Sequence, residues 1–313
     1  MLPASSVLSA AASVAGSGLP ADSMSEIAAQ PGWRATLDLQ LQNVDGVARV
    51  TRRRHSGPLL VQRAFYPERA SPASRLSTAQ PMSEPCHVYI IHPPGGLASG
   101  DGLELCATVE CGAHALLTTP AAGKFYRRGE AGVARLSQRL RVDGGVLEWL
   151  PQENIFYPNA AAALATVVHL SAGARFIGWE VGCFGLPASG RTLESGEVRQ
   201  SFELWQDDRP LLLERLTIKQ AALSARWGLA DHSTTGTWLG FPAGPAELQC
   251  ARAHTETSCG GLTVACTLVD EVLVCRALGQ RADHVIQVFI GLWRALRPAF
   301  TGREAVAPRV WAT

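Results

Sequence analysis

Four acidic side chains are the candidates in this sequence for acid–base chemistry. Asp101 follows a glycine loop, and Glu153 follows a Pro-Gln pair. Glu148 lies within a predicted strand, and Glu180 ends another one. Two carboxylates flanking a glycosidic bond can hydrolyse it, so a β-stacked hydrolase that uses two of these four is one hypothesis. The other is an inner polar channel, in which the same negative charges would guide a hydrated cation.

Soft and borderline metal ligands gather in one stretch of the chain. They suit nickel or zinc, and they are Cys86, His87, His92, Cys111 and His114. No pair has the close spacing of a structural site, such as Cys-x₂-Cys or His-x₃-His. We therefore predict no tight metal site and no permanently bound cofactor. A transient path of weakly binding oxygens and imidazoles requires no such motif.

The sequence lacks the motifs that are typical of nucleotide-binding sites and of serine hydrolases. A phosphate-binding loop needs a glycine, four residues, Gly-Lys and then Ser or Thr. Here Phe125 follows Gly123 and Lys124, and position 118 is a threonine where the first glycine should stand. No Gly-x-Ser-x-Gly motif occurs either. If the process this protein serves consumes nucleotide, a partner must bind it.

Composition narrows the class of protein further. Hydrophobic residues make up 47% of the 313 positions, which is enough for a substantial core. The net charge of +1 gives no indication of a surface that binds nucleic acid or an anionic membrane. The eight cysteines include no Cys-x-x-Cys pair, which is typical of reduced thiols in a cytoplasmic protein. Residues 1–30 are rich in Ala and Ser with no basic start, so we predict a disordered tail rather than a secretory signal. Residues 31–313 are then expected to form a single β-rich domain.

Strand patterns dominate that domain. Residues 33–41 alternate apolar and polar side chains, as in a half-buried strand. Residues 59–61 and 263–274 also read as strands, and 198–206 with 211–216 predict a hairpin. The proline-rich stretch 67–85 predicts an irregular loop.

A weak repeat in the middle third predicts stacking. An apolar residue precedes a glycine by three positions at Gly112, Gly145 and Gly173, so similar glycine-containing hairpins are expected to form successive layers. One convincing helix covers 285–298, whose apolar residues recur at three-and-four spacing until Pro298 ends the run. Many strands with one or two helices near the C-terminus argue against an alternating βα fold.

Several separated motifs occur together in one order. They are Gly57-Pro58-Leu59, Cys86-His87-Val88-Tyr89, His92-Pro93-Pro94-Gly95-Gly96, Leu117-Thr118-Thr119-Pro120, Lys124-Phe125-Tyr126-Arg127, Glu148-Trp149-Leu150-Pro151-Gln152-Glu153, Gly178-Trp179-Glu180, Gly185-Leu186-Pro187-Ala188-Ser189-Gly190, and the closing runs from Trp293 to Pro298 and from Pro308 to Thr313. In this order they resemble the UreD (UreH) family of urease accessory proteins.

The resemblance implies an all-β fold in which strands stack in a helix-like way as layered sheets, with two helices. It also implies a non-enzymatic urease maturation factor in the cytoplasm. Such a scaffold binds the urease apoprotein subunits and recruits UreF and, through UreF, the GTPase UreG, which carries nickel. Nickel would be in transit through an internal tunnel. No nucleic-acid or membrane partner is expected, and homodimerisation within the complex is left open.

The resemblance also suggests site residues. The residues expected to line the tunnel are Asp101, Thr118, Thr119, Gln152, Glu153 and Glu180. The motif loops comprise His92, Pro93, Pro94, Gly95, Gly96, Lys124 and Tyr126, and the partner-binding candidates are Trp293, Arg297 and Trp311. Weak oxygen contacts suit passage because an ion held tightly by Cys or His would not leave. The two threonines have an alternative role in satisfying backbone groups near Pro120, and the tryptophans have one in core packing.

Overall fold

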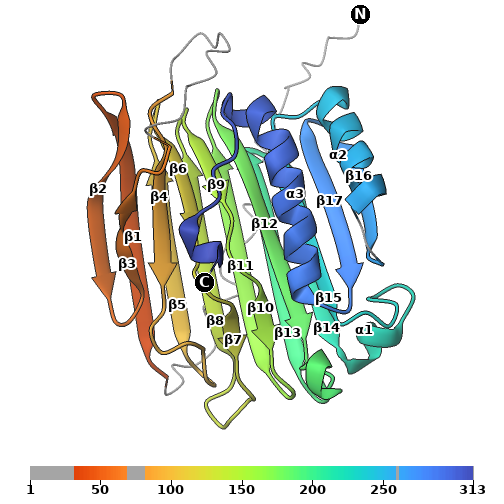
Figure 1. Ribbon diagram of the computed structural model, residues 1–313. Helices are drawn as coiled ribbons and strands as arrows, with labels where there is room; N and C mark the ends of the chain where they lie inside the picture. The colour runs from red at the N-terminus through yellow and green to blue at the C-terminus, as the bar shows by residue number, and fades with distance from the viewer. Residues whose placement is uncertain (1–31, 69–81, 259–260, 313) are drawn as a thin grey trace, which may run out of the picture. The chain divides into compact units, whose positions relative to one another are not determined.

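Two β-sheets and a layer of helices form the described part of the chain (Figure 1). The computed structural model describes residues 32–68, 82–258 and 261–312. The predicted tail at 1–30 and most of the predicted loop at 67–85 lie outside these ranges. Within them, no helix is both long enough and apolar enough to cross a membrane.

The first sheet has seven strands. Their order across the sheet is β14 (Arg209–Lys219), β13 (Glu197–Gln206), β11 (Ala161–Leu170), β8 (Ala134–Val142), β5 (Gly102–Val109), β1 (Arg34–Val44) and β2 (Val47–Ser56). Both the predicted strand at 33–41 and the predicted hairpin are confirmed, the latter as the antiparallel pair β13–β14.

The second sheet has ten strands. Its main order is β16 (Thr263–Val269), β17 (Val272–Gly279), β15 (Thr234–Phe241), β12 (Arg175–Phe184), β9 (Val146–Trp149), β6 (His114–Thr118), β4 (Cys86–Ile91) and β3 (Leu60–Phe65). The short strands β10 (Asn154–Phe156) and β7 (Gly123–Phe125) continue from β12. The helices are α1 (Gln220–Ser224), α2 (Pro245–Ser258) and α3 (Ala282–Thr301), with 3₁₀ turns at Pro187–Ser189 and Arg309–Ala312.

The predicted layers are present, but the turns between their strands differ from hairpins. β5, β8 and β11 lie parallel in one sheet, and each continues through a turn into β6, β9 or β12, which lie parallel in the other. The turn glycines with positive φ are Gly112, Gly144 and Gly173. The second is one residue earlier than the repeat suggested. Each turn therefore connects the two sheets, as in a β-solenoid.

Two predictions about the C-terminal third need correction. The stretch 263–274 contains a turn at Asp270, where φ is 49°, so it forms two strands instead of one. Helix α3 continues past Pro298 to Thr301 and ends at the left-handed Gly302. Pro298 has no N–H to donate to the Arg294 carbonyl, so one helical hydrogen bond is missing there, but its own carbonyl accepts from Gly302 N–H at 2.8 Å, which closes the helix. Helix α2 was not predicted from the sequence.

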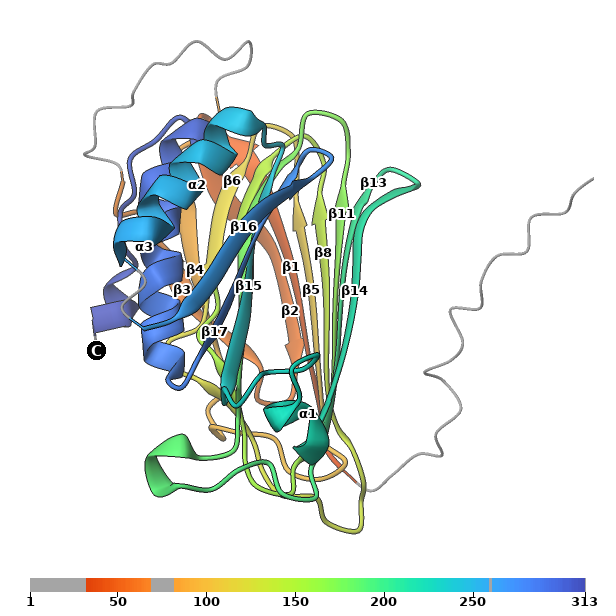
Figure 2. The same ribbon diagram turned by 90° about the vertical axis from the view of Figure 1, so that its right-hand side faces the viewer.

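Hydrophobic side chains form two cores. One lies between the two sheets and includes Leu37, Leu105 and Phe176. The other lies between the ten-stranded sheet and helices α2 and α3, and it includes Trp179 and Phe289. Figure 2 shows this order of layers, with α2 and α3 on one face of the ten-stranded sheet and the seven-stranded sheet on its other face. Strand β12 is therefore covered on both sides, and alternate residues enter different cores.

Candidate functional site

Two motif loops are joined by backbone hydrogen bonds. The first loop begins with a turn in which Gly95 N–H donates to the His92 carbonyl at 2.9 Å. Leu97 then donates to the Lys124 carbonyl at 2.7 Å and accepts from Tyr126 N–H at 2.9 Å. Segments about thirty residues apart in sequence thus form one rigid rim, because each fixes the backbone of the other.

Gly96 allows this close approach. A Cβ at this position would lie 2.5 Å from Tyr126 Cε2 and 2.8 Å from the Lys124 carbonyl oxygen. We expect Gly96→Ala to lower the free energy of unfolding by about 1–3 kcal/mol, as overpacking does in a close-packed interior. Urea denaturation of the full chain measures this. Gly95→Asn is the matched control, since Gly95 has φ +76° in open space and asparagine tolerates that conformation. Equal effects of the two substitutions would contradict the packing argument.

The rim surrounds a cavity of about 460 Å³ between the motif loops and the core. Of the motif-loop residues, those that line it are His92, Pro93, Gly95, Gly96 and Lys124, whereas Pro94 and Tyr126 do not. Of the predicted tunnel residues, Thr119, Gln152 and Glu180 line it. The structure therefore brings half of the predicted tunnel set to one cavity.

His92 is a neutral ring that lines this cavity. Burial lowers its pKa, and the nearby Asp101 charge opposes that shift only in part. The ring packs against Trp33 with 5.2 Å between centroids, and its Nε2 has no hydrogen-bond partner among the described residues. An unpaired imidazole nitrogen is a metal-ligating or hydrogen-bonding group.

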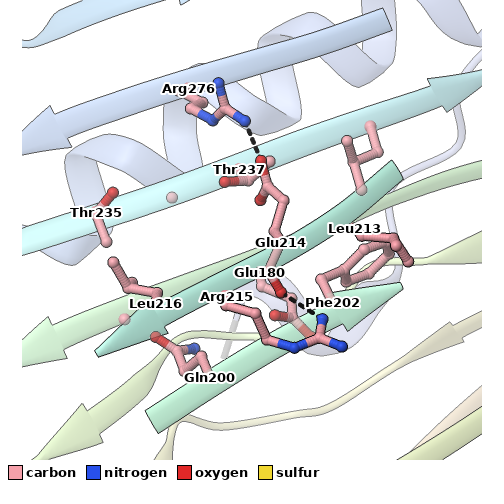
Figure 3. Close-up of a pocket in the computed structure, with 13 residues that line it drawn as sticks. Glu180, Gln200, Phe202, Leu213, Glu214, Arg215, Leu216, Thr235, Thr237 and Arg276 are labelled. Carbon is pink, nitrogen blue, oxygen red and sulfur yellow. Dashed lines mark hydrogen bonds and ion pairs between the residues drawn. The ribbon is translucent and has the colours of Figure 1, made fainter. Parts of the chain in front are cut away.

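Glu180 also lines a second cavity, of about 410 Å³. Figure 3 shows this cavity between β13 and β14 of one sheet and β15 and β17 of the other. The ion pair between Arg276 and Glu214 spans it from β17 to β14. One carboxylate thus faces both internal spaces.

The pKa of Glu180 is raised to about 7, because burial and the nearby Glu214 charge raise it by more than the hydrogen bond with Thr166 lowers it. The Thr166 hydroxyl lies in hydrogen-bond contact with Glu180 and, at 2.7 Å, with Gln138 Oε1. A hydroxyl has only one proton to donate. A protonated Glu180 that donates to Thr166 leaves the threonine proton for Gln138, which agrees with the raised pKa. Near neutral pH this carboxyl can therefore bind or release a proton.

The other three predicted tunnel residues do not line the first cavity, and each of them makes hydrogen bonds within the fold. Asp101 is buried, and its carboxylate accepts hydrogen bonds from Ala98 N–H at 2.8 Å and Trp33 N–H at 3.3 Å. Thr118 is fully buried and donates to the Leu150 carbonyl at 2.5 Å. Glu153 accepts from a neighbouring loop through its backbone carbonyl.

Thr118 and Trp311 form a direct contact. Trp311 Nε1 donates to Thr118 Oγ1 at 2.9 Å. Thr119 accepts from Gln152 N–H at 2.9 Å, so both threonines satisfy backbone or side-chain donors near Pro120. This is the alternative role that the sequence left open for them. Trp311 itself is half-buried against Trp179 and Trp293.

A buried ionic cluster lies on the helix side of the ten-stranded sheet. Arg297 donates to Glu148 at 2.9 Å and to Glu68 at 2.7 Å, and all three side chains are at most 2% exposed. His114 contacts Glu148 at 2.7 Å, and His87 contacts Glu68 at 2.8 Å. We refer to these five residues as the ionic cluster. Among the described residues, no three His, Cys, Asp or Glu side chains are grouped as a metal site would require.

Charge pairing determines the ionisation of the ionic cluster. Burial alone would raise the pKa of Glu148, but the Arg297 charge and the His114 hydrogen bond hold it well below its usual range. Glu68 is lowered for the same reason, by His87 and Arg297 against the effect of burial. Burial lowers the pKa of His114. The cluster therefore holds ionised carboxylates with a buried guanidinium between them.

The predicted partner-binding role of Trp293 and Arg297 needs correction. Both side chains are fully buried, and Trp293 Nε1 donates to Glu148 at 2.5 Å. Neither is available to a partner in this structure, because both hold the buried carboxylate. The ionic cluster was not predicted from the sequence, although one signal for it was present. Arg297 stands four residues after Trp293 on the apolar face of α3, where an unpaired charge would be costly.

The carboxylate pair of the hydrolase hypothesis does not form between Glu148 and Glu180. Glu148 pairs in register with Ile177 of β12, three residues before Glu180, so the two carboxylates lie on opposite faces of the sheet. Glu148 belongs to the ionic cluster beneath α3, whereas Glu180 contacts Thr166 of the other sheet. Asp101 is held in its own loop. Of the described carboxylates, Glu180 lines both cavities, and Glu214, which is paired with Arg276, lines the second.

Stacked sheets around internal cavities that share one carboxylate define a layered β-protein with an internal polar site. The UreD family model, described as UreD urease accessory protein, matches residues 34–312. The chain therefore belongs to the UreD family of urease accessory proteins.

Relatives that match over most of their own length support the same assignment. A protein named urease accessory protein UreD from Klebsiella pneumoniae subsp. pneumoniae is 39% identical over 284 residues, which cover 90% of this chain and 96% of the relative. Those from Pseudomonas putida and Alcanivorax borkumensis carry the same name. They are 41% identical over 286 residues and 38% identical over 289 residues, covering 90% of this chain and 95% and 93% of the relatives. All three are named as accessory proteins.

Proposed function

We propose that this chain is a non-enzymatic scaffold for urease maturation, which binds the urease apoprotein and recruits UreF and, through it, the GTPase UreG. Family membership supports this role, since its relatives carry the name urease accessory protein. The seven cysteines in the described residues are all free, in agreement with a cytoplasmic location for the assembly.

We further propose that nickel, as cargo, passes through the interior of this chain. The observation that carries this proposal is the position of Glu180, which lines both cavities. Thr119, Gln138 and Gln152 add neutral oxygens beside it. One titratable carboxylate with neutral oxygens binds a hydrated cation weakly, as transit requires. Glu180 would exchange its proton for the ion on entry and regain the proton on release.

The scaffold proposal is tested with the tagged full chain in cells that express the urease subunits, UreF and UreG. We expect these partners to co-purify with the chain and urease activity to fall to background when the chain is omitted. Absence of association together with unchanged activity would refute the scaffold role.

The transit proposal is tested in the same cells with Glu180→Ala. We expect the complex to assemble while nickel per urease active site falls severalfold, because the carboxylate between the cavities is lost. Glu130→Ala, which removes an exposed carboxylate, is the matched control. Normal nickel loading by the Glu180 variant would refute transit through this site and leave the scaffold role intact.

A further inference from the structure

Two thiols lie opposite each other on the β16–β17 hairpin, and neither of them lines either cavity. Cys266 and Cys275 are register partners in this antiparallel pair, and Val269 with Val272 closes the hairpin at the two-residue turn. Hydrogen-bonded and non-hydrogen-bonded pairs alternate from the closing pair. The cysteines therefore form a non-hydrogen-bonded pair, in which Cα atoms are about 4.5 Å apart.

This separation suits a disulfide. Disulfides join residues whose Cα atoms are about 4.4–6.8 Å apart, so bridging Cys266 and Cys275 requires little backbone movement. Both thiols are free and face the core between the sheet and the helices, where their exposed fractions are 8% and 0%. The other described cysteines lie on other elements of the fold.

The two thiols have different surroundings. The Cys275 thiol donates to Cys266, and this hydrogen bond, the Thr255 hydroxyl at 3.9 Å and the Arg252 charge lower the pKa of Cys266 to about 7. Arg252 is held in place by hydrogen bonds to the Cys266 carbonyl at 3.2 and 3.3 Å. The hydrogen bond to Cys266 and burial raise the pKa of Cys275. A nucleophilic thiolate thus stands beside a protonated thiol that can resolve it.

We propose that Cys266 and Cys275 form a redox-active dithiol, which a hydroperoxide oxidises reversibly to a cross-strand disulfide. The Cys266 thiolate attacks the peroxide, so that an S–O bond forms as the O–O bond breaks, and the leaving oxygen takes a proton. Cys275 sulfur then attacks the sulfenic sulfur, an S–S bond forms, the S–O bond breaks and water leaves with the Cys275 proton. Two thiols and hydrogen peroxide thereby give one disulfide and two waters.

The experiment uses the reduced full chain, freed of reductant and treated with a slight excess of hydrogen peroxide. We expect the intact mass to fall by two hydrogen atoms and the alkylatable thiols to number two fewer than the eight of the reduced chain. Dithiothreitol should restore both values. Trypsin leaves both cysteines in one peptide because no Lys or Arg lies between Arg252 and Arg276. That peptide also contains Cys259, and additional cleavage after Glu271 separates Cys275 from the other two cysteines unless a disulfide joins it to one of them; the Cys259→Ser variant distinguishes the two cases.

Single variants test the separate roles of the two cysteines. Cys275→Ser should accumulate a sulfenic acid that a 1,3-dicarbonyl probe labels, whereas Cys266→Ser should give neither label nor disulfide. Cys259→Ser and Cys106→Ser should oxidise as the unaltered chain does. Peptide mapping of the unaltered chain keeps the test valid if a variant fails to fold. A disulfide through other cysteines, or eight alkylatable thiols after oxidation, would overturn the proposal.

Discussion

Arg297→Met will lower the free energy of unfolding of the full chain by about 3–5 kcal/mol. The substitution keeps most of the volume of the side chain but leaves Glu148 and Glu68 as buried carboxylates without their shared cation. Against the effect of burial, Glu148 is held ionised chiefly by this guanidinium, and Glu68 by His87 together with the guanidinium. Urea denaturation monitored by tryptophan fluorescence measures the change, since Trp293 lies against the ionic cluster.

Arg294→Met on the same helix is the matched control. Arg294 is exposed, so its loss should change the free energy of unfolding by less than about 0.5 kcal/mol. Arg297→Lys should recover only part of the loss, because an ammonium cannot reproduce the planar fork that donates to both carboxylates. Equal effects of the Met substitutions at 294 and 297 would show that the buried charges are compensated in another way.

Glu180→Gln will stabilise the chain at pH 8 by up to about 3 kcal/mol relative to the unaltered protein. The folded pKa of this carboxyl is raised to about 7 from 4.5. The folded state therefore retains the proton while the unfolded state loses it, and stability from this group falls as pH rises from about 4.5 to 7. Glutamine remains neutral at every pH and lacks this loss.

The measurement is the difference in unfolding free energy between the variant and the unaltered chain from pH 5 to pH 8. It should grow with pH and level off above 7. The carboxylates of the ionic cluster have lowered pKa values, so they act in the opposite direction and lose stability on acidification. They are present in both chains and cancel in the difference. Glu130→Gln is the exposed control, and a difference that is flat with pH would contradict the proton assigned to Glu180.

The local sequence determined many of the elements of this fold, although α2 and the turn between β16 and β17 were not predicted from it. Alternating side chains in residues 33–41 predict β1 because only a strand places such residues on one face. Three-and-four spacing likewise predicts the buried face of α3. The ordered motifs indicated the family before any geometry was known, and the glycine repeat indicated stacked layers. These signals are readable because they depend on neighbours within a few residues.

Only the tertiary structure decided which side chains meet. Arg297 binds carboxylates 149 and 229 positions away, and no local pattern specifies such partners. The same packing placed Glu148 beneath a helix and Glu180 between two cavities, although both lie in adjacent strands. Burial and charge pairing depend on layers that assemble from distant segments. The sequence by itself therefore determined strands, loops and family, whereas the three-dimensional packing decided which carboxylate is held ionised by pairing and which one can exchange a proton.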